Sequence, residues 1–140
     1  MLLLDCPIRK TDWDQEISER NGFVFLREDE KKPVEDAGPW EPAVQEIIAY
    51  QQLQPNWDGY GAQVPSREVL ESAIGLAYCF YEKGVDPPHR VAPGVTGSVI
   101  FEWQDRDGAY TTVEIDAALH AEVMVIEPGK DPQQWTLPTD

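Results

Sequence analysis

The most regular pattern of apolar positions in the chain lies between residues 66 and 83. Apolar side chains recur there every three or four residues from Leu70 to Tyr81, which is the spacing of one face of an α-helix. Ser66 precedes this pattern and is a favourable N-cap, because its hydroxyl can accept a hydrogen bond from a free backbone N–H. Gly84 follows the pattern and is typical of a helix C-terminus. The sequence therefore predicts a helix over residues 66–83.

A shorter helix is expected over residues 42–53. Pro42 suits the first position of a helix, since its ring fixes φ and its missing N–H would have no partner in the first turn. Ile47 and Ile48 belong to an apolar stripe on this segment. Pro55 sets the limit by which the helix must end.

Beyond residue 96 the pattern changes from helical spacing to alternation, which is typical of half-buried β-strands. The dipeptide Asp107-Gly108 separates the first two alternating runs and is a strong hairpin signal. A three-stranded antiparallel meander is the simplest arrangement, with the helix over residues 66–83 covering its apolar face. The sequence thus predicts an α+β fold of two helices followed by three strands, which lie in residues 98–103, 111–115 and 121–127.

The remaining segments are less regular and divide the chain into three regions. Residues 1–40 are interpreted as a polar, partly irregular leader, in which one short strand is predicted over residues 22–26. Residues 41–128 form the predicted compact domain, within which prolines limit residues 85–96 to at most a short edge strand. Residues 129–140 are predicted to be a loose tail, apart from Trp135, which is expected to pack back on the domain.

Residues 56–62, with the sequence Asn-Trp-Asp-Gly-Tyr-Gly-Ala, join the two predicted helices. Glycine adopts backbone conformations that other residues avoid, and Asn and Asp side chains bond to nearby backbone groups, so we expect a loop of defined shape. Trp57 and Trp103 are either core anchors or exposed anchors for a partner. We favour the core interpretation, in which Trp57 fills the junction of helix and sheet while Asn56 and Asp58 cap backbone groups.

The net charge of the chain limits the classes of partner that we expect it to bind. The chain of 140 residues has 26 acidic and 11 basic side chains and a formal net charge of −15. Affinity for nucleic-acid backbones comes mainly from Lys and Arg, so direct binding of that kind is not expected. A basic protein partner complements the charge, although an acidic surface also keeps a protein in solution. No secretory signal and no apolar run of about 18 residues is evident, so a cytoplasmic protein without a membrane anchor is expected.

Motifs of known catalytic and cofactor sites are missing from the sequence. It has no nucleophile elbow, no phosphate-binding glycine loop and no Cys-x-x-Cys pair. His89 and His120 lack neighbours at metal-ligand spacing, and Cys6 and Cys79 imply no disulfide framework. We therefore expect no metal, no cofactor and no catalytic residue.

Several of these features occur together in an order that resembles a group of small uncharacterised bacterial proteins. These proteins share an Asn-Trp-Asp-Gly-x-Gly-Ala loop, a following helix, and a strand in which a Gly is followed by Glu-Trp. In this chain the corresponding features are residues 56–62, the long helix, Gly97 and Glu102-Trp103. The resemblance covers residues 44–127. It implies a bacterial or phage origin and a compact α+β domain, and it implies no reaction.

The leading hypothesis is a non-enzymatic interaction module that binds a basic protein, as antitoxin, immunity and chaperone proteins do. Its candidate surface is the exposed side of the meander, which carries Glu102, Glu114, Asp116 and Glu122. An electrostatically matched partner would associate quickly and with strong salt dependence.

Two other hypotheses remain open. In the first, the loop from Asn56 to Tyr60 lies beside Glu102 and Trp103 and holds a sugar or a cation, or Asp58 and Glu102 act as paired carboxylates in hydrolysis. In the second, the acidic surface mimics DNA. The candidate site residues are therefore Trp57, Asp58, Tyr60, Glu102, Trp103, Glu114, Asp116 and Glu122.

Overall fold

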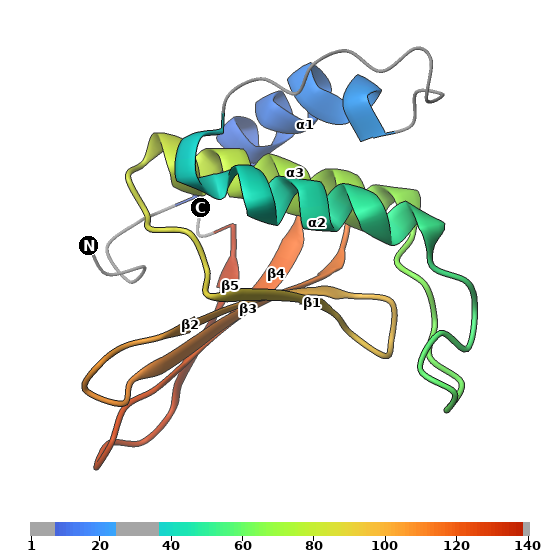
Figure 1. Ribbon diagram of the computed structural model, residues 1–140. Coiled ribbons are helices and arrows are strands. Elements are labelled where there is room, and N and C mark those ends of the chain that lie inside the picture. Colours follow the sequence, from blue (N-terminus) through green and yellow to red (C-terminus); the bar gives the residue numbers. More distant parts are fainter. Residues whose placement is uncertain (1–7, 25–36, 139–140) are drawn as a thin grey trace.

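The computed structural model describes residues 8–24 and 37–138. It confirms the predicted α+β class but contains more elements than the two helices and three strands that were expected. The described residues form three α-helices and a five-stranded antiparallel sheet. The helices all lie on one side of the sheet (Figure 1), so the other side of the sheet carries no helix from the described part of the chain.

The helix α3 (Arg67–Glu82) lies at the centre of the helical layer and agrees with its prediction. Its N-cap is Ser66, whose Oγ accepts a hydrogen bond from the backbone N–H of Val69 at 3.2 Å. Gly84 ends the helix with a φ of +79°, a conformation that favours glycine. Nearly every side chain from Val69 to Phe80 is buried, because the helix contacts both the sheet and the helix α1 (Lys10–Val24).

The helix α1 lies within residues 1–40, which were predicted to be a partly irregular leader with one short strand. Residues 22–24 are helical, so the strand prediction over residues 22–26 is wrong there, and residues 25 and 26 lie outside the described residues. Among residues 10–21 the only large apolar side chains are Trp13 and Ile17. Such a narrow stripe gives a weak helical pattern, although it is enough to pack on a neighbouring helix.

Trp13 fixes α1 to α3. Its side chain is fully buried, and its Nε1–H donates a hydrogen bond to the carbonyl oxygen of Ser72 at 2.7 Å. Gly75 allows the close approach of the two helices, since a Cβ at this position would lie 2.7 Å from Cγ1 of Ile17. Residues of the predicted leader therefore contribute to the hydrophobic core.

The predicted helix over residues 42–53 corresponds to α2 (Glu41–Ala49) followed by the 3-10 turn η4 (Tyr50–Gln52). A second 3-10 turn, η3 (Gly38–Trp40), leads into α2. The Oη of Tyr50 donates a hydrogen bond to the carbonyl oxygen of Val91 at 3.1 Å. This bond ties the end of the helix to the first strand of the sheet.

The sheet is a meander whose spatial order equals its order along the chain. The three predicted strands are β2 (Val99–Gln104), β3 (Tyr110–Ala117) and β4 (His120–Ile126). The predicted Asp107-Gly108 hairpin is confirmed, with Gly108 at a φ of +90°. The predicted short edge strand is β1 (Arg90–Pro93), which pairs with β2.

The last strand, β5 (Gln133–Leu137), corrects the prediction of a loose tail. It pairs antiparallel with β4, where Trp135 lies opposite Val123. Trp135 packs against the core, as the sequence suggested, and Leu137 is buried within it. The strand was missed because it is short and polar and because Pro132 and Pro138 flank it.

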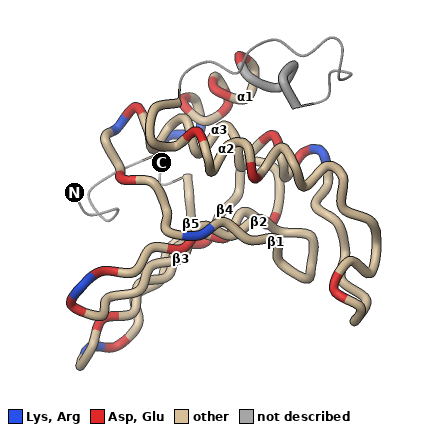
Figure 2. Tube along the Cα trace, viewed as in Figure 1, with Lys and Arg blue, Asp and Glu red and all other residues tan. Residues whose placement is uncertain are grey.

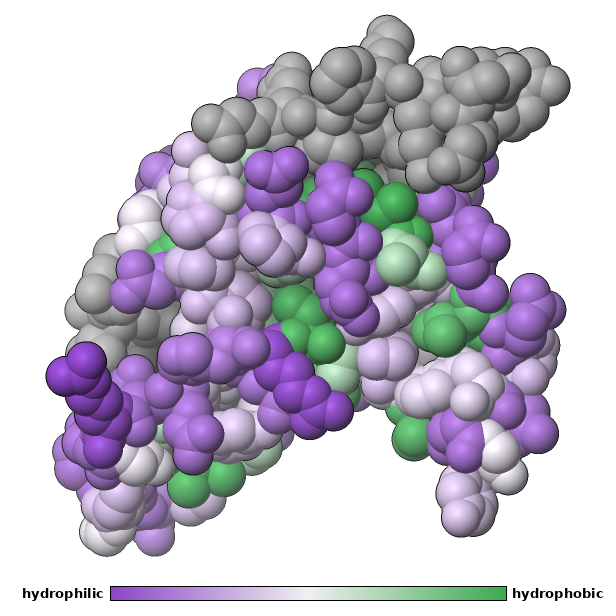
Figure 3. All heavy atoms as spheres, viewed as in Figure 1, coloured by the Kyte–Doolittle hydropathy of each residue, from purple (hydrophilic) through white to green (hydrophobic). Residues whose placement is uncertain are grey.

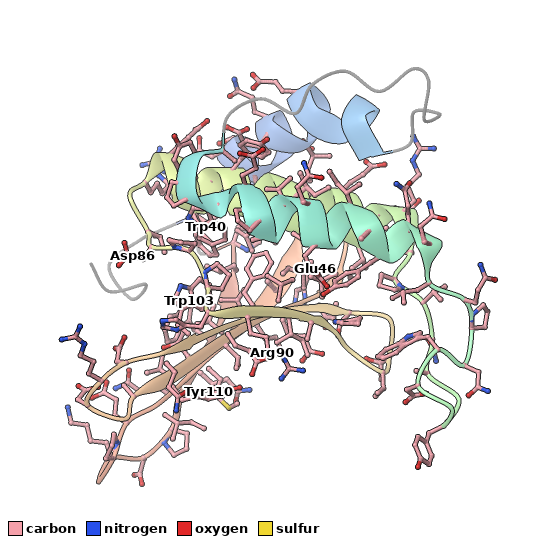
Figure 4. The ribbon with its side chains drawn as sticks, in the orientation of Figure 1. Trp40, Glu46, Asp86, Arg90, Trp103 and Tyr110 are labelled. Atoms are coloured by element: carbon pink, nitrogen blue, oxygen red, sulfur yellow. The ribbon has the colours of Figure 1, made fainter. Side chains whose placement is uncertain are left out.

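Three buried aromatic side chains and the half-buried Trp103 pack against one another between the helices and the sheet. The ring centroids of Trp40, Phe80, Phe101 and Trp103 lie 5.8–6.5 Å apart, mostly in edge-to-face pairs. Two of the indoles also bind the connector that follows α3: Nε1–H of Trp40 donates to the carbonyl oxygen of Val85 and Nε1–H of Trp103 to that of Asp86 (Figure 4). The core interpretation of Trp103 is therefore confirmed.

Candidate functional site

The side of the sheet that faces away from the helices carries most of the predicted interaction residues. Val99, Phe101 and Val113 are fully buried on the helical side, so the alternate residues of these strands point to the other side. We call this side the outer face. Its central residues are Ile100 and Glu102 of β2, Tyr110, Thr112 and Glu114 of β3, and Glu122 and Met124 of β4.

The outer face contains an open hollow of about 600 Å³ beside β1. Apolar side chains such as Ile100, Met124 and Val95 line it together with the carboxylates of Glu102 and Glu114. The outline of the molecule is indented on this side of the sheet, between the loop of residues 56–62 and the ends of the strand hairpins (Figure 3). The hollow therefore combines apolar contact area with two carboxylates and with the guanidinium group of Arg90, which also lines it.

Glu102 is the most firmly held of these carboxylates. Its Oε1 accepts a hydrogen bond from Oη of Tyr110, and its Oε2 lies 3.3 Å from Nη1 of Arg90. This hydrogen bond, aided by burial, raises the pKa of the Tyr110 phenol, so the phenol keeps its proton and remains a donor. The side chain of Arg90 is 71% exposed and that of Glu102 only 16%, so the ion pair is open to solvent from the arginine side (Figure 4).

Glu114 is positioned by a buried hydroxyl. The Oγ of Ser98 donates a hydrogen bond to Oε2 of Glu114 at 2.7 Å, and Ser98 is fully buried. Gly94 leaves room for this hydroxyl, since a Cβ at residue 94 would lie only 2.0 Å from it. Gly94, Ser98 and Glu114 therefore lie next to one another at the rim of the hollow.

Glu122 lies directly opposite Glu114 in the pairing of β3 with β4. Like charges in opposing positions of neighbouring strands destabilise a sheet. Acidic residues also occur on the helices and loops (Figure 2), so charge alone does not distinguish the outer face. The direct opposition of two glutamates on neighbouring strands does distinguish it.

Asp116, the fourth predicted acid, lies apart from this group. It precedes the turn between β3 and β4, where the pairing register shifts. Its Oδ1 lies 2.6 Å from Nδ1 of His120, and both side chains are 43% exposed. Asp116 therefore has a local partner and does not line the hollow of the outer face.

The loop of residues 56–62 has a defined shape, as predicted. Oδ1 of Asp58 accepts hydrogen bonds from the N–H groups of Tyr60 and Ala62, at 2.8 and 3.0 Å, and Oδ1 of Asn56 accepts one from the N–H of Gly61 at 2.5 Å. The predicted capping roles of Asn56 and Asp58 are thus confirmed. Tyr60, at the tip of the loop, is 93% exposed.

The structure does not bring the predicted loop site together. Trp57 is only half-buried and lies outside the core, and its Nε1–H donates a hydrogen bond to the carbonyl oxygen of Gln63, directly after the loop. The prediction that Trp57 fills the junction of helix and sheet is wrong. Glu102 and Trp103 are neighbours on one strand and therefore point to opposite sides of the sheet, so they cannot line one pocket with the loop.

Sequence reasoning did not name Tyr110 or Arg90 as residues of the outer face, and it gave Ser98 no role there although alternation put Ser98 on the face of Glu102. Tyr110 and Glu114 have the same parity on β3, so the alternation could have placed the tyrosine beside the acids. Ser98 begins the alternating run of Glu102 and shares its parity in the same way. Arg90 gave no such signal, because its position depends on the pairing of β1 with β2.

Two kinds of feature have no counterpart among the described residues. No helix among them is long and apolar enough to cross a membrane. In residues 8–24 and 37–138, no group of three or more His, Cys, Asp and Glu side chains is arranged to hold a metal ion.

Comparison with known proteins adds no homologue to this picture. Neither a protein family, nor a curated protein, nor a solved structure matches the chain.

Proposed function

We propose that the protein is a non-enzymatic interaction module whose outer face binds a basic protein partner, in the manner of an antitoxin, an immunity protein or a chaperone. The observation that supports this most strongly is the opposed pair of Glu114 and Glu122, with Glu102 on the same face. Two facing carboxylates lower the stability of the free protein. Cationic side chains of a partner would remove this repulsion on binding.

The apolar part of the outer face supports the same proposal. Ile100 and Met124 line the hollow, and Ile126 at the end of β4 is 39% exposed. Protein interfaces combine an apolar centre with charged residues around it. The charges would speed association and select a basic partner, whereas the apolar contacts would slow dissociation.

Co-purification tests the existence of the partner. The tagged protein is isolated from its host at low and moderate salt, and the proteins that co-elute are identified by mass spectrometry. We expect a stoichiometric basic protein that is lost as salt rises, because surface charges are screened over about 10 Å at 0.1 M salt. A solitary protein under both conditions would contradict the proposal.

Charge reversal tests the surface. The variant Glu114→Lys/Glu122→Lys is compared with Glu41→Lys/Glu82→Lys, which makes the same change in net charge at exposed positions of the helical layer. We expect the first variant to bind the isolated partner at least about tenfold more weakly and the second to change affinity by no more than about threefold. Equal losses in both variants would show that net charge, and not the outer face, controls binding.

A further inference from the structure

The two edge strands of the sheet, β1 and β5, differ in how well they are protected against pairing with a strand of another molecule. At β1, the carbonyl oxygen of Val91 accepts the hydrogen bond of the Tyr50 hydroxyl, and Pro93 has no N–H to offer. Arg90 adds a charge to this edge. Prolines, charges and covering groups are the means by which proteins prevent unwanted pairing at strand edges. The β1 edge is therefore closed to another strand.

The β5 edge has none of these devices within the strand. Its five residues include no proline and no ionisable side chain. In the part of the chain that the structure describes, β5 pairs with β4 alone. Every other strand carries a charged residue: Arg90 in β1, Glu102 in β2, Glu114 in β3 and Glu122 in β4.

We propose that β5 is a self-association strand, to which β5 of a second copy of this chain adds in antiparallel orientation. The two-fold axis passes beside Trp135, so that this residue faces Trp135 of the partner subunit. Gln134 then faces Thr136 of the partner subunit, and Gln133 faces Leu137 of the partner subunit. The two sheets become one continuous sheet.

The sequence of β5 suits this register. Gln134 and Thr136 are exposed on the outer face and form polar cross-strand pairs, and no position sets like charges against each other. Trp135 is half-buried and packed against the core, so its ring is held in place to meet an aromatic partner across the axis. Pro132 and Pro138 limit the pairing to the five residues of β5.

The composition of β5, and not the net charge of the chain, favours a second copy over a basic partner strand at this edge. A basic strand would find no carboxylate on β5 itself, whereas self-pairing needs only an edge without opposed charges. Two neighbouring antiparallel strands are related by a two-fold rotation axis that is perpendicular to the sheet. Both helical layers therefore lie on one side, and the two outer faces lie next to each other on the other side.

Sedimentation equilibrium of the full chain at about 0.05 and about 0.5 M NaCl tests self-association. Each copy carries a net charge of −15, so we expect a dimer whose dissociation constant falls as salt rises. Binding of the proposed basic partner has the opposite salt dependence, so a negative result for self-association does not contradict the proposed function, and the reverse is also true. A monomer at both salt concentrations, even in millimolar protein, would overturn the inference.

Paired substitutions test the register. Gln134→Lys/Thr136→Lys sets lysines against each other across the axis at two places, whereas Gln134→Glu/Thr136→Lys sets opposite charges there. Both variants share the Thr136→Lys change beside Glu122, and thermal unfolding of the monomer checks that both fold. We expect the dissociation constant to rise about tenfold in the first variant relative to the second. Equal dissociation constants would show that another surface holds the dimer.

Discussion

Glu114 on β3 and Glu122 on β4 lie directly opposite each other on the outer face. Because opposed like charges lower the stability of a sheet by up to about 1 kcal/mol, we expect Glu122→Gln to raise the free energy of unfolding by roughly that amount. Urea denaturation at low ionic strength measures the change. The gain should shrink at high salt, because exposed charges are then screened. A gain that is independent of salt would indicate a cause other than repulsion.

The hydroxyl of Ser98, which donates a hydrogen bond to Glu114, lies where a side chain at residue 94 would begin, and this makes Gly94 sensitive to substitution. In Gly94→Ala the new Cβ would lie 2.0 Å from Oγ of Ser98, so the hydroxyl must rotate and lose its bond to Glu114. We expect a loss of about 1–3 kcal/mol in the free energy of unfolding, from crowding and the broken hydrogen bond together. Denaturant unfolding provides the measurement.

The double variant Gly94→Ala/Ser98→Ala is the control for this mechanism. Without the hydroxyl, the alanine at residue 94 meets less crowding, so the double variant should lose less stability than the sum of the single variants. Additive losses would mean that Gly94 acts independently of Ser98.

Substitution of Asp58 tests whether its side chain holds the loop of residues 56–62 in shape. Its Oδ1 accepts hydrogen bonds from the N–H groups of Tyr60 and Ala62, and an Asn side chain offers a similar carbonyl oxygen. We expect these two amides to exchange hydrogen faster in Asp58→Ala but to keep most of their protection in Asp58→Asn. Nuclear magnetic resonance of the exchanging amides makes the comparison. Similar exchange in all three proteins would show that backbone bonds alone hold the loop.

The predicted elements of the fold were those with strong local patterns. α3 has a cap, a wide apolar stripe and a closing glycine, and β2 to β4 alternate around a hairpin signal. By contrast, α1 and β5 depend on a few side chains that become buried only through contacts with distant residues, as Trp13 does against Ser72. Local periodicity carries little of that information.

The candidate site was predictable to a similar degree. Alternation correctly placed Glu102, Glu114 and Glu122 on one face, because residue parity fixes the side of a strand. It also implied that Trp103 lies on the other side from Glu102. The position of Trp57 was mispredicted because a tryptophan that satisfies its N–H inside a loop looks the same in sequence as one that fills a core.

Trp13 tests whether the N-terminal region is a separate leader. The sequence leaves open whether residues 1–40 fold onto the domain of residues 41–128. If they formed a separate leader, substitutions in them would leave the stability of that domain unchanged. Since Trp13 is fully buried against α3, we expect Trp13→Ala to lower the free energy of unfolding by about 3–5 kcal/mol. Trp13→Phe keeps the ring but loses the bond to Ser72, and it should cost less. A stability unchanged in both variants would support the separate leader.

Because of the buried thiol of Cys79, we expect the free energy of unfolding to fall at alkaline pH. Burial is the main cause that raises the pKa of its thiol from 9.0 to about 12, and the charge of Glu16 adds to it. Because the folded pKa exceeds the unfolded one, this contribution to stability is complete below pH 9.0 and is lost as the pH rises toward about 12. Urea unfolding as a function of pH should therefore show a shallower alkaline decline in Cys79→Ala than in the natural sequence.

A second measurement distinguishes the contribution of the Cys79 thiol to the alkaline decline from that of the tyrosines. Burial also raises the pKa of Tyr50, so part of the alkaline decline should persist in Cys79→Ala. In a Cys6→Ser background, which removes the other thiol, the folded protein should react with a thiol reagent at about pH 8 far more slowly than the urea-unfolded protein, because the buried thiol stays protonated. Equal reaction rates in the folded and unfolded states would contradict the raised pKa.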